Sequence, residues 1–150
     1  MMLDKSMSRI FIAVVSHGHE RIIKELDCLA GLNEKLKVIV KINKENTDLD
    51  YYRLNEIEFI DSDYNLGFGG NNNLIYEYCK ESLGMNSNDY YLILNPDVDV
   101  DAKLLNDLIV DMKENDRDIC TINLFKDRSL TEYDYSVRRF PCFMDFFGHF

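Results

Sequence analysis

The sequence predicts a layered α/β domain with a largely parallel central sheet. Apolar runs of strand length alternate with segments in which apolar residues recur every three or four positions, the spacing of one helical face. The connections are short, and no internal repeat, low-complexity segment or interdomain linker separates these segments. Alternating strands and helices of this kind build a sheet covered by helices, and the pattern predicts five strands. The 150 residues fit one domain of this class.

The first strand is expected at residues 10–15, where six apolar residues follow one another. Residues 16–19, Ser-His-Gly-His, then turn into a helix that begins near Glu20. Gly31 can take the left-handed conformation that often follows the last turn of a helix. The apolar face of this helix consists of Ile22, Ile23, Leu26 and Leu29.

Two further strands are expected at residues 36–42 and 57–60, separated by a polar stretch. In that stretch Glu45, Asp48 and Asp50 predict a solvated loop rather than a site. A helix follows and ends near Leu83, before Gly84. Either Asn71 or Asn72 could cap its start, and its inward-facing residues are Leu74, Ile75, Tyr78 and Cys79.

The strand at residues 90–94, Tyr-Tyr-Leu-Ile-Leu, is predicted to be buried on both faces. Pro96 ends it, because proline has no N–H to donate to a neighbouring strand. Asp101 is a good N-cap for the next helix, which carries Leu104, Leu105, Leu108, Ile109 and Met112. A last strand is expected at residues 119–125. Residues 126–137 show no clear period, which leaves a mobile loop or a β-hairpin as alternatives.

The bulk composition limits the function classes. There are 17 basic and 27 acidic residues, a net charge of −10, which argues against nucleic acid as a partner. Three of the four cysteines (Cys28, Cys79 and Cys120) lie among apolar neighbours, and we expect them to be buried free thiols. The start lacks the apolar segment of a signal peptide, and no run of 18 apolar residues occurs. These features predict a cytoplasmic protein, with at most peripheral contact with the inner face of a membrane.

Two polar segments carry the functional signal. Asn95, Asp97 and Asp99 directly follow the strand at residues 90–94, and open α/β sheets usually bind ligands at the carboxyl ends of their strands. An ordinary strand-to-helix turn would also contain Asn, Pro and Asp. The second segment, residues 65–73, reads Asn-Leu-Gly-Phe-Gly-Gly-Asn-Asn-Asn and does not match the dinucleotide-binding pattern of glycines. Its glycines allow a ligand or a neighbouring strand to approach the backbone closely.

Together these two segments resemble the nucleotide-sugar-binding half of family 2 glycosyltransferases, especially the rhamnosyltransferase-like branch. The family segment N-x-G-F-(A/G)-x-x-x-N is matched by Asn65, Gly67, Phe68 and Asn73. The family strand ending in L-N-P-D is matched by residues 94–97. The resemblance covers residues 9–147 and implies the GT-A fold, a Rossmann-like three-layer sandwich. It further implies one donor-binding domain over residues 1–150, truncated after the donor half.

The resemblance implies inverting, metal-dependent transfer of a sugar, such as rhamnose, from a nucleoside-diphosphate donor to a polysaccharide or lipid-linked glycan acceptor. Asp97 stands where many members hold a metal and the diphosphate, so Mg²⁺ or Mn²⁺ is the expected cofactor, with Asp99 as a second candidate ligand. The residues expected to bind the nucleotide sugar are Ser16, His17, Asn43, Asn65, Gly67, Phe68, Gly69, Asn73, Asn95 and Asp97. Two positions depart from the family: Gly18 replaces an Asn, and Asn43 is the nearest match to an Asp that meets the base or ribose.

An inverting transferase also needs a general base, which the resemblance places in an acceptor-binding half downstream. The late acidic residues Glu132, Asp134 and Asp145 lie in no recognisable base motif. We therefore expect residues 1–150 alone to turn over donor slowly or not at all, as a fragment or truncated product would. The alternative is a nucleotide-sugar-binding or assembly module without turnover. A sugar nucleotidyltransferase would need a basic, glycine-rich loop after the first strand, which residues 16–19 do not supply.

The C-terminal segment, residues 138–150, is aromatic. Phe143, Phe146, Phe147 and Phe150 follow the spacing of one helical face. Packing against the chain's own sheet is the simplest interpretation. The alternatives are a homodimer contact, a cover for the surface that an acceptor half would occupy, or a shallow membrane contact aided by Arg138 and Arg139. The net charge makes the membrane contact the weakest of these.

Overall fold

The computed structural model describes residues 8–122 and 124–134. The chain divides into two compact units, Met1–Leu108 and Ile109–Phe150, and each is described by itself. The elements are β1 (Ile10–Ser16), α1 (Glu20–Leu26), α2 (Cys28–Asn33), β2 (Lys37–Ile42), α3 (Asp50–Leu54), β3 (Glu58–Ile60), α4 (Phe68–Glu81), β4 (Tyr90–Leu94), α5 (Ala102–Glu114), β5 (Leu124–Phe125) and β6 (Tyr133–Asp134).

The first unit contains a four-stranded sheet in the order β3-β2-β1-β4. All three pairings are parallel, and Ile12 of β1 lies opposite Val38 of β2 and Leu92 of β4. The prediction of an α/β domain with a parallel central sheet is therefore confirmed. The sheet has four strands among the described residues rather than the expected five.

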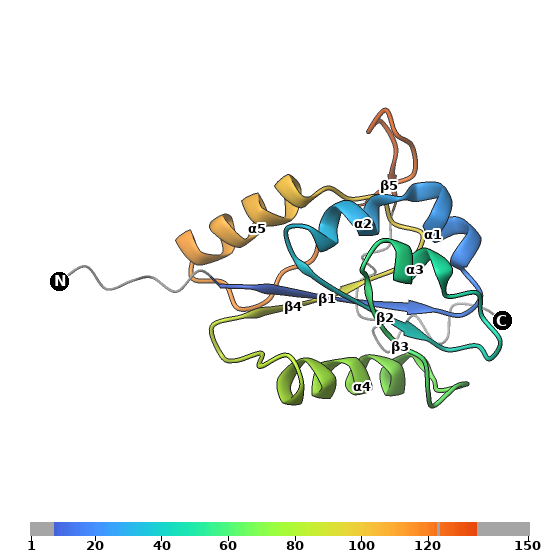
Figure 1. The fold of residues 1–150 in the computed structure, drawn as a ribbon. Coiled ribbons are helices and arrows are strands. Elements are labelled where there is room, and N and C mark those ends of the chain that lie inside the picture. The colour runs from blue at the N-terminus through green and yellow to red at the C-terminus, as the bar shows by residue number, and fades with distance from the viewer. Residues whose placement is uncertain (1–7, 123, 135–150) are drawn as a thin grey trace, which may run out of the picture. The chain divides into compact units, whose positions relative to one another are not determined.

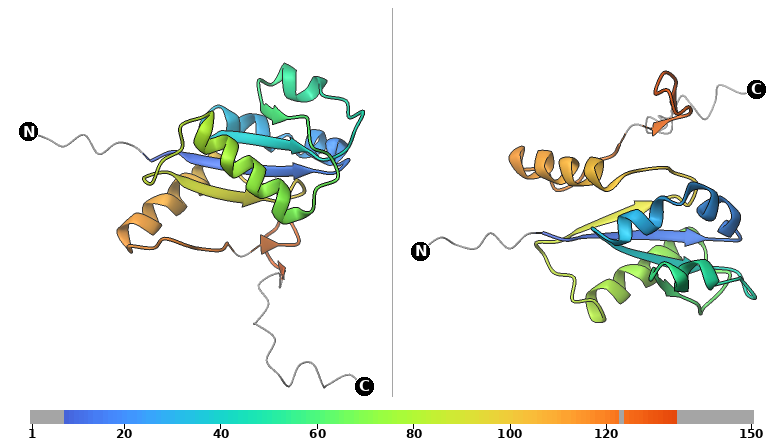
Figure 2. Two further views of the ribbon diagram at one scale, coloured as in Figure 1. Left: turned by 90° about the horizontal axis from the view of Figure 1, so that it is seen from below. Right: turned by 45° about the horizontal axis from the view of Figure 1, so that its top comes forward.

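Helices cover both faces of this sheet (Figures 1 and 2). On one face Phe11, Ala13 and Ile39 form a buried cluster with Ile75 and Cys79 of α4. Because strand side chains alternate, Ile12 and Val14 point to the opposite face, which α1 and α2 cover. The Cys79 thiol is fully buried, and this burial raises its pKa to about 11, whereas Cys28 and Cys120 are half-buried free thiols.

The helix expected from Glu20 is broken in two. Asp27 adopts a left-handed φ of 50° between α1 and α2, and the Tyr51 hydroxyl donates a hydrogen bond to its carboxylate at 2.7 Å. Gly31 lies inside α2, so the prediction that it ends the helix is wrong. The prediction of a loop around residues 45–50 was also incomplete, because helix α3 forms at the end of this stretch and its Tyr52 is fully buried.

The ends of α4 and α5 confirm some of the expected caps and correct others. Gly84, with a φ of 65°, follows α4 as predicted, and the Leu104 amide donates to the Asp101 carboxylate at 2.7 Å, which confirms the α5 N-cap. Gly67 is the N-cap of α4. Asn71 and Asn72 do not cap the helix, because they are buried inside it and their amides donate back to preceding carbonyls.

Strand β4 is less buried than the sequence predicts. Ile93 is 48% exposed, and only Leu94 of this strand is buried. The reason is pairing: among the described residues β4 is hydrogen-bonded to β1 alone and forms an edge of the sheet. An apolar run of five residues cannot show from sequence whether one or two neighbours flank it.

In the second unit, β5 and β6 pair in an antiparallel hairpin. Of the two alternatives for residues 126–137, the hairpin is therefore observed as far as residue 134, and residues 135–137 lie outside the described residues. The ring centroids of Phe125 and Tyr133 lie 4.5 Å apart across this hairpin. The strand expected at residues 119–125 is confined to β5, because residues 119–122 have no strand partner and Ile119 is 86% exposed. The aromatic segment 138–150, with Cys142, Asp145 and the predicted dimer contact, lies outside the described residues.

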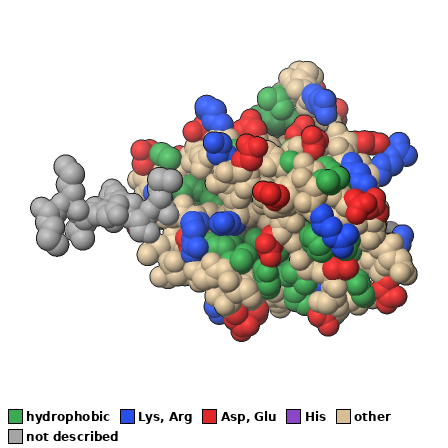
Figure 3. Space-filling view, in the orientation of Figure 1, with side chains coloured by type: hydrophobic (Ala, Val, Ile, Leu, Met, Phe, Trp, Pro, Cys, Tyr) green, Lys and Arg blue, Asp and Glu red, His purple; other side chains and the backbone are tan. Residues whose placement is uncertain are grey.

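Over the described part of the chain, no helix is long and apolar enough to cross a membrane. Acidic and basic side chains are interspersed on the face shown in Figure 3, despite the net charge of −10.

Candidate functional site

A cavity of about 360 Å³ lies at the carboxyl ends of the parallel strands. The chain runs from β1 through β2 to β3 in one direction, then crosses by α4 to β4 on the other side of β1. Ligands of open α/β sheets bind in the crevice at this point of reversal. The residues that line the cavity are Val15, His17, His19, Asn43, Leu66, Phe68, Asn71, Ile93, Leu94, Asn95, Pro96 and Asp97.

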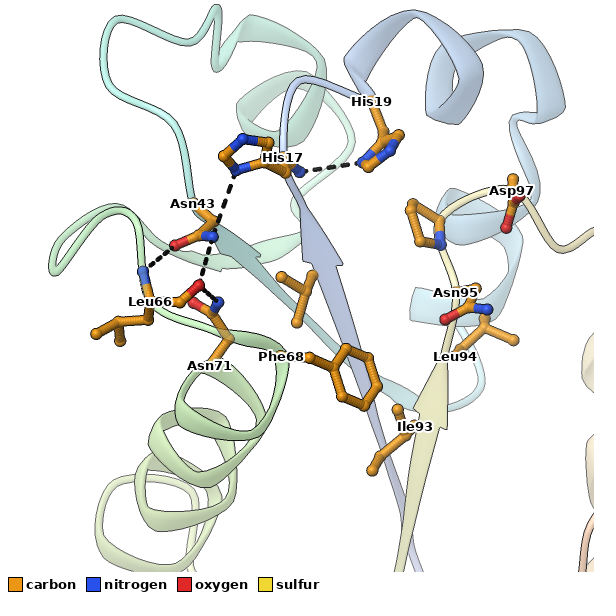
Figure 4. A pocket seen from close by; sticks show the side chains of 12 residues that line it. His17, His19, Asn43, Leu66, Phe68, Asn71, Ile93, Leu94, Asn95 and Asp97 are labelled. Atoms are coloured by element: carbon orange, nitrogen blue, oxygen red, sulfur yellow. Dashed lines mark hydrogen bonds between the residues drawn. The ribbon is translucent and has the colours of Figure 1, made fainter. Parts of the chain in front are cut away.

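Two polar walls face each other across an apolar floor (Figure 4). On one wall, His17 and His19 follow β1 and Asn43 follows β2. On the other wall, Asn95 and Asp97 follow β4. Phe68, at the start of α4, is 63% exposed and lies beside Ile93. Small-molecule sites typically have this composition, with apolar surface and a few convergent polar groups, and the volume is at the lower end of their range.

The turn after β4 presents Asp97 to the cavity. Pro96 ends the strand, and the Val98 amide closes the turn by donating to the Asn95 carbonyl at 3.2 Å. Asp97 is exposed, and within residues 8–122 and 124–134 no hydrogen bond or ion pair engages its carboxylate. This carboxylate is therefore available to a ligand or a cation.

Asp99 does not line the cavity. Asp99 instead lies close enough to Cys28 to act on its thiol: burial raises the pKa of that thiol, and the negative charge of Asp99 also raises it. Asp97 and Asp99 are thus not brought together on the cavity wall.

A divalent cation would have few protein ligands here. Among the described residues no group of three or more His, Cys, Asp or Glu side chains converges on one point. Mg²⁺ commonly accepts one or two carboxylates and takes its other ligands from substrate phosphates and water. Asp97 fits a cation that is shared with a phosphorylated ligand, and it does not fit an all-protein metal site.

On the opposite wall, hydrogen bonds join Asn43 to residues 65–73, here called the glycine-rich segment. The Leu66 amide donates to Asn43 Oδ1 at 3.0 Å, and Asn43 Nδ2 donates to the Leu66 carbonyl at 2.9 Å. That carbonyl also accepts from Asn71 Nδ2 at 2.8 Å. His17 and His19 are linked as well, since the His17 amide donates to His19 Nδ1 at 3.0 Å.

A fully buried lysine lies near this wall and was not anticipated. Lys41, two residues before Asn43, donates from Nζ to the Ile42 carbonyl at 2.5 Å, and Nζ lies 5.6 Å from the centre of the Tyr64 ring. Burial lowers the pKa of this amine, and the carboxylates of Asp63 and Asp61 act in the opposite direction.

The structure brings half of the predicted nucleotide-sugar residues to the cavity: His17, Asn43, Phe68, Asn95 and Asp97. Ser16 is fully buried, donates to Glu20 and accepts from the His19 amide. The remaining predicted residues are exposed nearby without lining the cavity: Asn65, Gly67, Gly69 and Asn73.

Sequence reasoning missed seven lining residues: Val15, His19, Leu66, Asn71, Ile93, Leu94 and Pro96. Val15, Ile93 and Leu94 could have been found, because the last residues of a strand lie at the edge where ligands bind. Leu66 and Asn71 lie within the segment 65–73 that the resemblance singled out, at positions where its pattern specifies no residue.

Comparison with known proteins gives one informative similarity. The chain is similar to the rhamnosyltransferase WbbL of Escherichia coli (strain K12). The two are 36% identical over 148 residues, which cover 94% of this chain. The chain spans about half the length, 54%, of that relative. No family model matches the chain, and no solved structure matches it.

This similarity supports the resemblance to glycosyltransferases that the two sequence segments carry. It extends over both segments and over the strands that build the cavity. The assignments to family 2 and to the GT-A type still rest on the sequence motifs.

Proposed function

We propose that this chain is the donor-binding part of a family 2 glycosyltransferase of the GT-A type, and that it binds a nucleoside-diphosphate sugar between β1 and β4. One observation carries the proposal. The Asn-Pro-Asp turn, which the family resemblance assigns to the donor, lines the cavity at the reversal of strand order. The similarity to a rhamnosyltransferase makes an activated rhamnose the first donor sugar to test.

Charge makes a cation part of this proposal. The described residues that line the cavity include no lysine or arginine, and the chain carries a net charge of −10. A donor diphosphate therefore needs positive charge from elsewhere. Mg²⁺ or Mn²⁺ held by Asp97 would stabilise the negative charge that develops on the leaving diphosphate. Asp99 would act, if at all, through a water molecule.

The other lining residues bind and orient the donor. Phe68 and Ile93 offer apolar surface that excludes water from one side of the cavity. Asn95 has a side chain that no described group engages, and it can hydrogen-bond the donor next to Asp97.

Sugar transfer by the complete protein is the further part of the proposal. The acceptor would be a polysaccharide or a lipid-linked glycan, and an inverting reaction would need a base to remove the proton of its hydroxyl. Glu132 and Asp134 are exposed in the second unit, and neither lines the cavity. A nucleotide-sugar-binding module without turnover is the second candidate, favoured by this lack of an acidic base in the described site.

Calorimetry tests the binding. Wild-type chain is titrated with UDP and with TDP, with and without Mn²⁺, and compared with Asp97→Ala and Asp118→Ala. Asp118 is an exposed aspartate that does not line the cavity, so its variant controls for the loss of one charge. We expect Mn²⁺-dependent binding that Asp97→Ala weakens by about 10-fold or more, the size of a lost charge-assisted contact. Equal binding by Asp97→Ala, or binding that does not need the metal, would remove the case for the site.

A further inference from the structure

We propose that Asn43 is a positioning residue: its amide fastens the glycine-rich segment and the start of α4 to the end of β2, and does not read the nucleobase. The proposal rests on the proposed function for the identity of the ligand only. Asn43 stands where the family resemblance places an aspartate that meets the base or ribose. The geometry gives this asparagine a different task.

Both ends of the Asn43 amide hydrogen-bond to the backbone of Leu66, and Nδ2 also lies 3.4 Å from His17 Nδ1. Oδ1 accepts from the Leu66 N–H at 3.0 Å, and Nδ2 donates to the Leu66 carbonyl at 2.9 Å. Asn43 is only 6% exposed, so its side of the two hydrogen bonds is shielded from water. An aspartate could not replace it, because a carboxylate has no donor and would face the Leu66 carbonyl with a second oxygen.

The Leu66 carbonyl joins three parts of the chain. It accepts from Asn43 at the end of β2 and from Asn71 in α4 at 2.8 Å. These two bonds use both lone pairs of the oxygen. Figure 4 shows the two asparagine side chains meeting at this backbone group from opposite sides. The segment therefore has a fixed attachment next to Phe68, which forms part of the cavity.

The attachment has a conformational cost to offset. Asn65, directly before Leu66, has a φ of 62°, in the left-handed region, which asparagine adopts more often than most non-glycine residues but less readily than glycine. Its own amide makes a longer backbone bond of 3.4 Å to the Asn43 carbonyl. The short bonds to Leu66 thus hold a turn that the backbone alone would hold weakly.

This role predicts how nucleotide affinity changes. Without the Asn43 amide, Leu66 and Phe68 lose their fixed position, and every ligand of the cavity is affected alike. If Asn43 instead contacted the base, its replacement would change the ratio of affinities for different bases, because their hydrogen-bonding groups differ.

The experiment has a ligand-free arm and a ligand arm. Hydrogen exchange of the Leu66 amide is followed by NMR in the wild type, Asn43→Ala, Asn43→Asp and the control Asn33→Asp. Asn33 donates to the Glu56 carbonyl and does not line the cavity. Calorimetry of the same proteins uses UDP, CDP and GDP with Mn²⁺.

We expect a protected Leu66 amide in the wild type, since within residues 8–122 and 124–134 this amide donates to the Asn43 side chain alone. Exchange should be about 10-fold faster in both Asn43 variants. Affinities for the three nucleotides should fall by a common factor of about 10, and Asn33→Asp should change neither property. An unprotected wild-type Leu66 amide overturns the proposal even if the variants do not fold. A base-selective loss also overturns it. Failure of the wild type to bind any nucleotide defeats the proposed function, while the exchange arm still decides the role of Asn43.

Discussion

The variant Gly69→Ala tests whether a bound ligand, rather than the fold, requires glycine at the start of α4. Gly69 occupies the second position of α4, with a helical rather than left-handed backbone. A Cβ built there would meet no atom within 4 Å. The fold itself therefore does not require glycine at this position, and alanine fits without strain.

The expected gain in folding stability comes from an effect on the unfolded chain. A Gly→Ala change at a compatible position stabilises a protein by about 0.4–1 kcal/mol, because alanine loses less backbone entropy on folding. For a domain of this size that raises the melting temperature by about 1–4 °C. If a nucleotide approaches the start of α4, the same methyl group stands in its way, and affinity should fall by about 10-fold or more.

The assay pairs thermal unfolding, followed by circular dichroism, with calorimetric titration of UDP in the presence of Mn²⁺. Gly31→Ala is the matched control, because Gly31 is helical in α2 and a Cβ there would meet no atom within 4 Å. Gly31 also lies outside residues 65–73, the segment that the family resemblance assigns to the donor. This control variant should raise the melting temperature and leave binding unchanged. A Gly69→Ala protein that melts higher and binds UDP as well as the wild type would refute the idea that a ligand uses this backbone.

Other predictions concern stability alone. Asp101→Ala removes the bond to the Leu104 amide and should cost about 1 kcal/mol in urea unfolding. Ile75→Ala, at a fully buried position, should cost about 2–5 kcal/mol in the same assay. A hydrogen bond from Arg9 holds the pKa of Asp89 at about 2, below its ordinary 3.8. The charged carboxylate therefore stabilises the fold above about pH 4, and this stabilisation is lost as the pH falls towards 2. Asp89→Asn should therefore be less stable than the wild type in unfolding at pH 7, and the difference should narrow between pH 4 and pH 2.

The sheet was predictable because its strands are apolar runs too short to be helices, and because helical connections between them impose parallel pairing. The break between α1 and α2 was not predictable in the same way. It depends on Asp27 and on a hydrogen bond from Tyr51, 24 residues further along the chain. The exposed face of Ile93 likewise depends on which strands flank β4, which no local pattern encodes.

The residues of the candidate site likewise include some that the sequence could predict and some that it could not. Pro96 marks the end of β4 in the sequence, so Asn95 and Asp97 could be placed at the edge of the sheet from the sequence alone. The environment of Asn43 could not, because it is set by the backbone of Leu66, 23 residues away. Local chemistry therefore identified the groups that are free to bind, and missed those that hold the cavity together.

The two polar walls of the cavity consequently differ in what they can offer a ligand. On the wall after β1 and β2, the amide of Asn43 is engaged by the protein itself. Asn71 Nδ2 donates to two backbone carbonyls, while Asn71 Oδ1 is buried and has no hydrogen-bond partner among the described residues. On the wall after β4, Asn95 and Asp97 have side chains that no described group engages. Under the proposed function, the diphosphate and its cation therefore belong on the β4 side. The planar or apolar part of the donor then belongs against Phe68, whose ring is 63% exposed and offers apolar surface.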